Sequence, residues 1–264
     1  MREICQDSLP VKPWMEEKTR RLPGLHPIAP GDWLRMDEAY GPQMAYRDEL
    51  LAGHRDAVFR MSETALPAAQ ELLDRVLQEI SGTPGYVISP EKVRCPDGRV
   101  VALDRSQPLV AAARLVQEDL VLMEKHETEH ILTGAVLCFP ASWSLEEKFG
   151  GTLTMIHVPV SPYTEDIGAR VQRLFDFIKP ELPMWRANYL VYSNPDLFQP
   201  RREDNRRSLD PDGPKWVRVE RQCLVKLPVS GAVVFSIHTY VVPMATLSDA
   251  ERVGLRDYEP AVHE

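Results

Sequence analysis

The spacing of hydrophobic residues changes along the chain. In the first half, residues 69–80 and 109–123 repeat apolar side chains at i, i+3, i+4 and i+7, which predicts two amphipathic helices. Pro108 costs little near the start of the second helix, because the first turn has no intrahelical partner for its N–H groups. Residues 32–59 are also predicted to be helical.

The second half predicts strands with one inserted helix. Apolar runs at residues 131–139 and 151–158 indicate buried strands, and residues 165–178 place their apolar side chains on one helical face. Two further strands, residues 216–227 and 232–242, are separated by a short turn containing Pro and Gly, which indicates a hairpin. Helices followed by strands with an inserted helix predict an α+β fold with an antiparallel sheet.

Composition and charge narrow the possible partners. The chain has 264 residues and a formal net charge of −8, which disfavours nucleic acid because phosphate binding needs clustered positive charge. No apolar run approaches the ~20 residues that cross a bilayer, and the N-terminus shows no signal-peptide stretch. The four cysteines form no C-x-x-C pair. We therefore expect a cytoplasmic protein with packed thiols and no membrane partner.

One short motif suggests zinc. His126, Glu127 and His130 match H-E-x-x-H, which on a helix places two histidines on one face to bind zinc, with the glutamate as general base. The predicted helix ends near Lys125, however, and a strand-like run follows His130. A polar turn between helix and strand is the favoured interpretation, and a zinc hydrolase is the alternative.

His157 is a candidate metal ligand. In the predicted strand 151–158 it shares a face with Leu153 and Met155, and a sheltered neutral imidazole is a good iron ligand. The alternative is a core histidine that bonds to a backbone carbonyl.

The predicted hairpin carries polar residues on an apolar face. Arg221 lies among valines of the first strand, and a buried arginine needs an ion-pair partner or a bound anion. A symmetric turn would place it opposite His238, with Cys223 opposite Ser236 and Tyr240 nearby. This cluster is a candidate binding site, and an internal ion pair is the alternative. Glu220, on the other face with Arg218 and Lys226, is expected to belong to a solvated charge ladder.

Seven segments taken together resemble the haem-dependent oxidative N-demethylase alpha-subunit family. The resemblance covers roughly residues 30–244, and the combination is specific although no single segment is. The segments are VQEDL (116–120), LCFP (137–140), WSLEEK (143–148), IHVPV (156–160), RANY (186–189), VERQ (219–222) and SIHTY (236–240).

The resemblance implies a PAS-like haem-binding core, residues 85–245, between an N-terminal helical extension, residues 1–84, and a C-terminal tail, residues 246–264. It implies haem b with His157 as iron ligand, and cofactor contacts from Arg186, Asn188 and Arg221. The implied activity is a monooxygenase-type oxidation of a small amine or related metabolite by O2. Arg221, His238 and Tyr240 are the candidate catalytic residues, and electrons would come from a separate reductase that carries flavin and an iron–sulfur centre.

Two departures from the family pattern affect the functional expectation. Tyr189 stands where the family usually has Trp, and His238 stands where a longer basic residue is common. His238 would therefore change the polarity of a distal pocket or act as a second axial ligand. A haem or gas sensor without catalysis is the alternative function.

Overall fold

The computed structural model describes residues 4–20, 24–157, 165–202, 210 and 212–257. Its centre is a seven-stranded antiparallel sheet with the order β1-β8-β9-β10-β6-β7-β2. In chain order its strands are β1 (His26–Pro27), β2 (Phe59–Met61), β6 (Asp119–His126), β7 (Glu129–Val136), β8 (Met184–Tyr192), β9 (Trp216–Lys226) and β10 (Val233–Pro243). A small separate sheet contains β3 (Val87–Ile88), β4 (Lys92–Arg94) and β5 (Val100–Ala102).

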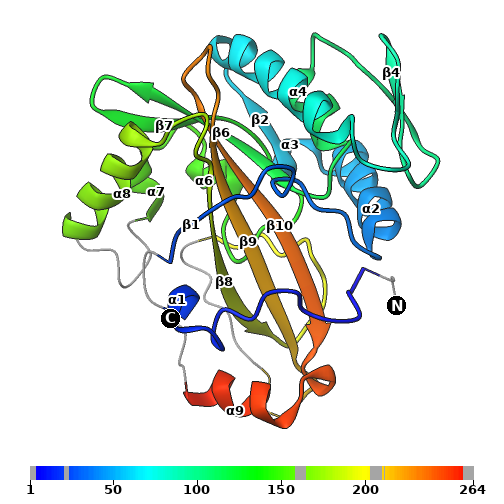
Figure 1. The fold of residues 1–264 in the computed structure, drawn as a ribbon, viewed down its shortest axis with the longest axis vertical. Coiled ribbons are helices and arrows are strands. Elements are labelled where there is room, and N and C mark those ends of the chain that lie inside the picture. Colours follow the sequence, from blue (N-terminus) through cyan, green and yellow to red (C-terminus); the bar gives the residue numbers. More distant parts are fainter. Residues whose placement is uncertain (1–3, 21–23, 158–164, 203–209, 211, 258–264) are drawn as a thin grey trace.

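Helices lie on both sides of the main sheet (Figure 1). The helices are α1 (Glu17–Arg20), α2 (Tyr40–Gly53), α3 (Arg55–Val58), α4 (Leu66–Ile80), α5 (Pro108–Ala113), α6 (Leu145–Lys148), α7 (Leu153–His157), α8 (Glu165–Phe177) and α9 (Asp249–Asp257), with 3-10 turns at Glu63–Ala65 and Met244–Thr246. None of the helices in the described residues is long and apolar enough to cross a membrane.

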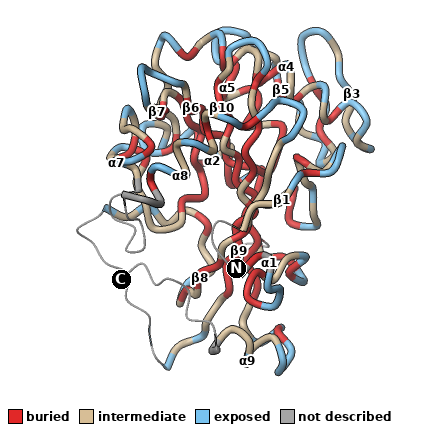
Figure 2. The backbone as a smooth tube through the Cα atoms, turned by 60° about the vertical axis from the view of Figure 1, so that its left-hand side comes forward, coloured by how far each residue is buried: buried red, intermediate tan, exposed pale blue. Residues whose placement is uncertain are grey.

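The two faces of the main sheet have different covers. On one, called here the N-terminal face, Val225 and Val234 pack with residues of α2, α4 and α5, while Val219 and Tyr240 pack with Trp14 of the N-terminal segment. On the other, called the α8 face, the sheet packs against α7 and α8. Because both faces are covered, the central strands are buried along most of their length (Figure 2).

The α+β class with an antiparallel sheet is confirmed. The helix at residues 69–80 lies within α4, the inserted helix is α8, and the β9–β10 hairpin has the expected register, with Arg221 opposite His238 and Cys223 opposite Ser236. The three-part division at residues 84 and 245 stays a prediction. The first of these parts contributes β1 and β2 to the main sheet.

Three local predictions are wrong. Residues 109–123 do not form one helix: α5 ends at Ala113, and β6 begins at Asp119. Four successive residues of β6, 120–123, are buried because both faces of this strand are covered, and such a run can match a helical period. Residues 32–59 contain α2 and α3, but 32–39 are not helical.

The predicted strand at residues 151–158 is the third error, because Leu153–His157 is helix α7. The Oγ1 atom of Thr152 accepts a hydrogen bond from the Met155 N–H at 3.3 Å, and the Thr152 carbonyl accepts one from the Ile156 N–H at 2.9 Å. A threonine in this position favours the start of a helix over a strand.

Long-range polar contacts fasten the helices to the sheet. Arg47 of α2 is fully buried and donates to Asp119 Oδ1 at 2.8 Å, while Asp119 also accepts the N–H groups of Cys138 and Phe139. The carboxylate of Glu71 on α4 accepts two N–H groups of the β9–β10 turn, at 2.7 Å each.

We expect Arg47→Met to lower the free energy of unfolding by about 3–5 kcal/mol, because it leaves a buried carboxylate uncompensated. Arg105→Met is the matched control, since Arg105 pairs with Asp74 at the surface and should contribute less than about 1 kcal/mol. Urea unfolding monitored by circular dichroism measures both. Equal losses would contradict the role given to the buried pair.

Candidate functional site

The structure places the predicted site residues on opposite faces of the main sheet. Side chains alternate along a strand, and Met184 of β8 packs with Phe175 of α8, so Arg186 and Asn188 lie on the α8 face. Arg221 of β9 and His238 and Tyr240 of β10 lie on the N-terminal face. The predicted catalytic and cofactor-binding residues therefore do not form one cluster.

His238 is held between two carboxylates. Its Nδ1 lies 3.0 Å from Glu118 Oε1 and its Nε2 lies 3.0 Å from Asp37 Oδ2, and its side chain is 1% exposed. Burial alone lowers the pKa of His238, but the charge of Glu118 and the hydrogen bonds to Asp37 and Glu118 raise it to about 9. His238 is thus an imidazolium that donates from both ring nitrogens near neutral pH.

Arg221 has internal partners. It donates to the backbone carbonyls of Trp33 and Asp32 at 2.9 and 2.6 Å, and its Nη2 lies 3.3 Å from Asp32 Oδ2. Its guanidinium also lies over the Trp185 ring, 5.3 Å from the centroid. Of the two alternatives for a buried arginine, an internal ion pair is the one observed.

Three cations and three carboxylates form what we call the His238 cluster. Its charges cancel when His238 is protonated, and it fastens residues 32–37 to β9 and β10. The members are Asp32, Arg35, Asp37, Glu118, Arg221 and His238. Tyr240 bonds to Arg35 at its margin, where burial raises the pKa of Tyr240 to about 12.

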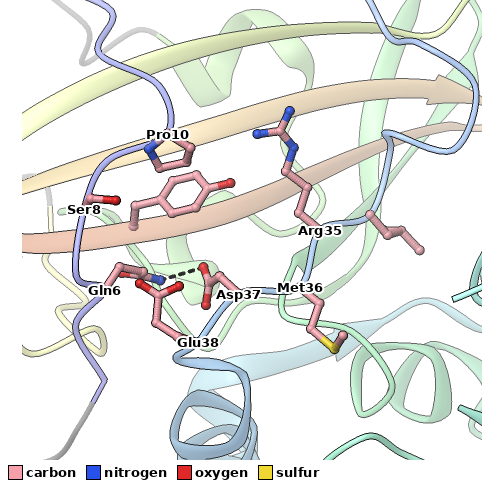
Figure 3. Close-up of a pocket in the computed structure, with 9 residues that line it drawn as sticks. Gln6, Ser8, Pro10, Arg35, Met36, Asp37 and Glu38 are labelled. Atoms are coloured by element: carbon pink, nitrogen blue, oxygen red, sulfur yellow. Dashed lines mark hydrogen bonds between the residues drawn. The ribbon is translucent and has the colours of Figure 1, made fainter. Parts of the chain in front are cut away.

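A pocket of about 390 Å³ opens beside this cluster (Figure 3). Its lining residues are Gln6, Ser8, Pro10, Leu34, Arg35, Met36, Asp37, Glu38 and Tyr240. Gln6 donates to Asp37 at 2.9 Å, and Glu38 accepts the N–H of Asp7 at 2.7 Å. These polar contacts hold the N-terminal segment against residues 37 and 38.

The α8 face carries a second polar group. Asn188, Glu220 and Thr239 lie side by side on β8, β9 and β10. Glu220 accepts from Arg218 at 3.2 Å and from Gln222 at 3.0 Å. Arg218 and Glu220 are 1% and 4% exposed, so the predicted solvated ladder is wrong for both. The loops after β7 and β8 cover this part of the face, since Arg218 donates to the carbonyls of Phe139 and Leu197.

Asn188 offers an open hydrogen-bond acceptor for a ligand on this face. Its Oδ1 is buried and accepts no hydrogen bond within the described part of the chain. A buried acceptor without a donor is costly unless a bound group supplies one. Arg186 lies two residues earlier on the same face of β8. This pair fits a bound group that carries both hydrogen-bonding and negatively charged parts.

The segment containing His157 lies on the same side. Leu153 and Ile156 of α7 pack in the cluster that includes Leu224 and Phe175. His157 is the last residue of α7, and its side chain is outside what the structure describes. α7 thus brings the backbone of the predicted ligand to the α8 face.

The H-E-x-x-H motif lies on a β-hairpin, not on a helix and not between a helix and a strand. His126 ends β6, and β7 begins at Glu129. His126 is exposed, whereas His130 is buried, with its Nδ1 2.9 Å from Gln172 Nε2. The helical geometry that the zinc motif requires is not present in these residues.

Sequence reasoning missed Asp37 and Glu118, and it placed Arg218 and Glu220 in solvent although both are buried. Glu118 and Asp119 together precede an apolar run, and Arg218 lies in a strand rich in valine. A charge beside or inside a strand buried on both faces could have indicated an internal pair. Asp37, in contrast, lies in an irregular segment, where no period distinguishes it.

The chain is an α+β protein with a seven-stranded antiparallel sheet. On the α8 face of this sheet, β8 carries Arg186 and the open acceptor of Asn188, and α7 packs on the same face against β7. Residues 24–256 match the model of a family described as haem-dependent oxidative N-demethylase, alpha subunit-like. The match spans most of the chain, and the chain belongs to this family.

Stability should fall between about pH 6.5 and 9 because of His238. A histidine whose folded pKa is raised above 6.5 stabilises the fold fully below 6.5, and this contribution is lost as pH rises through 9. We expect the wild type to lose up to about 3 kcal/mol across this range.

His238→Gln should be less stable at pH 6.5 and show little change up to pH 9. Guanidinium unfolding at several pH values measures this, with His126→Gln on the exposed hairpin as control. An equally steep decline in His238→Gln would assign the pH dependence to other groups.

Proposed function

We propose that this chain is a haem-dependent oxidative enzyme of the monooxygenase or oxidative N-demethylase type, acting on a small amine or related metabolite. The proposal places haem b on the α8 face. The observation that carries it is the buried, unused acceptor of Asn188, two residues from Arg186 on the sheet face against which α7 and α8 pack. Membership of the haem-dependent family supports the choice of cofactor.

Three residues would hold the haem in this proposal. His157 would bind the iron through its imidazole. Arg186 would pair with a propionate, since a guanidinium matches carboxylate geometry. The amide of Asn188 would hydrogen-bond with the haem or with the substrate. The apolar side chains of Met184, Leu224 and Ile237 would exclude water from the same space.

The sheet supports a PAS-like core for this site. Five strands in the order β7-β6-β10-β9-β8 form one antiparallel unit, and α6, α7 and α8 are inserted between β7 and β8. The proposed core, residues 85–245, contains this whole unit, between an extension at 1–84 and a tail at 246–264.

Arg221, His238 and Tyr240 would act indirectly in this proposal. The internal pairs of Arg221 and His238 on the N-terminal face direct them away from the α8 face. They would therefore be positioning residues. They would fix the β9–β10 hairpin from the N-terminal face, while the side chains on its α8 face contact the haem. In this proposal Arg221 does not contact the cofactor, as the sequence led us to expect, but acts on it indirectly by fixing the position of β9.

When bound, haem would supply an iron at which dioxygen is activated for oxidation of the substrate. The chain's part would be to hold the iron from the His157 side, to neutralise the propionates and to keep bulk water out. The electrons would come from a separate flavin and iron–sulfur reductase.

The first test is the visible spectrum of protein expressed with haem supply. Wild type should show a Soret band that shifts on addition of dithionite and carbon monoxide, and His157→Ala should lose or displace it. His126→Ala, an exposed histidine on the hairpin, is the control and should leave the band unchanged. A band unaffected by His157→Ala would transfer the ligand role to another residue, and absence of a band in wild type would refute haem binding.

A second test separates the two faces. Arg186→Gln should weaken haem retention about tenfold, the size of one lost charge-assisted hydrogen bond. It should cost less thermal stability than Arg221→Gln, because Arg186 is less buried than Arg221. Arg221→Gln should lower the melting temperature, because it leaves buried partners, but the folded protein should keep its haem. Haem transfer to apomyoglobin and thermal unfolding measure the two effects. The reverse pattern would place the haem on the N-terminal face.

A further inference from the structure

The solvent side of α8 combines positive charge with an exposed aromatic ring. Arg170, Arg173 and Phe177 follow helical spacing and share one face, and all three are exposed. The Phe177 side chain is 76% exposed, although the neighbouring Phe175 and Ile178 are buried in the core. Together with the exposed Leu182 that follows the helix, this ring provides an apolar area that another molecule could cover.

The turn after α8 extends this surface. The N–H of Leu182 bonds to the carbonyl of Lys179 at 3.0 Å, so the chain reverses tightly beyond the helix end. Lys179 is exposed, and Leu182 is 51% exposed. We call Arg173, Phe177, Lys179 and Leu182 the α8 surface.

The charge of the α8 surface is opposite to that of the whole chain. Arg173 and Lys179 form no ion pair within the described residues. Asp176, on the adjoining side of α8, forms an ion pair with Lys125, with 2.6 Å between Lys125 Nζ and Asp176 Oδ1. In the turn after the helix, the exposed Glu181 is an acidic residue between Lys179 and Leu182. Basic residues that flank exposed apolar side chains, on a chain of net charge −8, match an acidic partner.

We propose that the α8 surface docks the acidic face of a separate electron-donating protein. The inference rests on the proposed function, because α8 covers the sheet face assigned there to haem (Figure 1). A donor at this position would approach the haem through one helix layer instead of through the whole sheet. One electron would pass from the reduced flavin of the donor to the haem iron, which changes from ferric to ferrous.

The test uses a flavodoxin, a small acidic flavin protein, as the probe. Calorimetry in low salt measures its binding to the full chain, so that this readout does not depend on haem. Charge reversal in R173E/K179E should weaken binding about tenfold or more, and added salt should weaken wild-type binding, since exposed charges are screened. Phe177→Ser should weaken binding without changing the salt dependence.

The matched control is K92E/R94E on the small sheet. Lys92 and Arg94 are exposed, carry the same charges and form no ion pair within the described residues, but β4 lies on the other side of the molecule from α8 (Figure 1). This variant has the same net charge as R173E/K179E and should bind flavodoxin within about twofold of wild type. Equal weakening in both variants would overturn the proposal and indicate general attraction.

Measuring haem reduction separates the proposed docking from the proposed haem-dependent function. Stopped-flow reduction by flavodoxin hydroquinone should slow in R173E/K179E, while reduction by dithionite should not. Absence of a Soret band refutes the proposed function but leaves the binding result to decide the docking. No flavodoxin binding by wild type, or a change of oligomeric state in R173E/K179E seen by sedimentation, would overturn the docking even if haem is present.

Discussion

Four charged side chains of the β9–β10 hairpin lie inside the protein, two on each face of the main sheet. Arg218 and Glu220 point toward the α8 face, and Arg221 and His238 point toward the N-terminal face. Removing a charge from water costs several kcal/mol unless partners compensate it. Other segments supply those partners: two carboxylates come from residues 32–37, one from Glu118, and backbone carbonyls come from the loops after β7 and β8.

The polar groups on the two faces of the sheet differ in whether they have partners within the protein. On the N-terminal face nearly every charged group has a partner within the chain, so that face holds the structure together. On the α8 face the Asn188 acceptor has none within the described residues. A ligand gains affinity by completing hydrogen bonds that the protein leaves open. Glu118 Oε2 on the N-terminal face also lacks a partner in the part of the chain that the structure describes, but the other oxygen of Glu118 is bonded to His238 and to the Arg35 N–H, whereas the single carbonyl oxygen of Asn188 is open. This difference favours a ligand on the α8 face.

Local sequence patterns predicted the β9–β10 hairpin well. A short turn with Pro and Gly fixes the register of two long strands, so the pairing of Arg221 with His238 followed from counting. The partners of these residues could not be counted in this way. Glu118 is 120 residues from His238 and Asp37 is 201 residues away, and no local period links them. The sequence identified the unusual residues but not their partners.

Hydrophobic period failed where both faces of a strand are covered. β6 has no alternation to distinguish it from a helix, and its first residues were assigned to the preceding helix. At His157 the error had another cause, because one threonine side chain starts α7 in a stretch whose residues alternate as in a strand. The resemblance to the family rested on short sequence motifs and not on hydrophobic periodicity. The family that it indicated is the one whose model matches the chain.

The position of β10 has a consequence for biosynthesis. The β6–β7 hairpin and the β8–β9 pair come earlier in the chain, yet they are joined only by β10, which lies between β9 and β6. On the ribosome, both pairs would wait with open hydrogen-bonding edges until residue 243 has emerged. Unpaired edges invite wrong pairing, so the nascent chain would be most vulnerable to aggregation late in translation. A premature stop between β9 and β10 would leave two separate half-sheets instead of one shortened sheet.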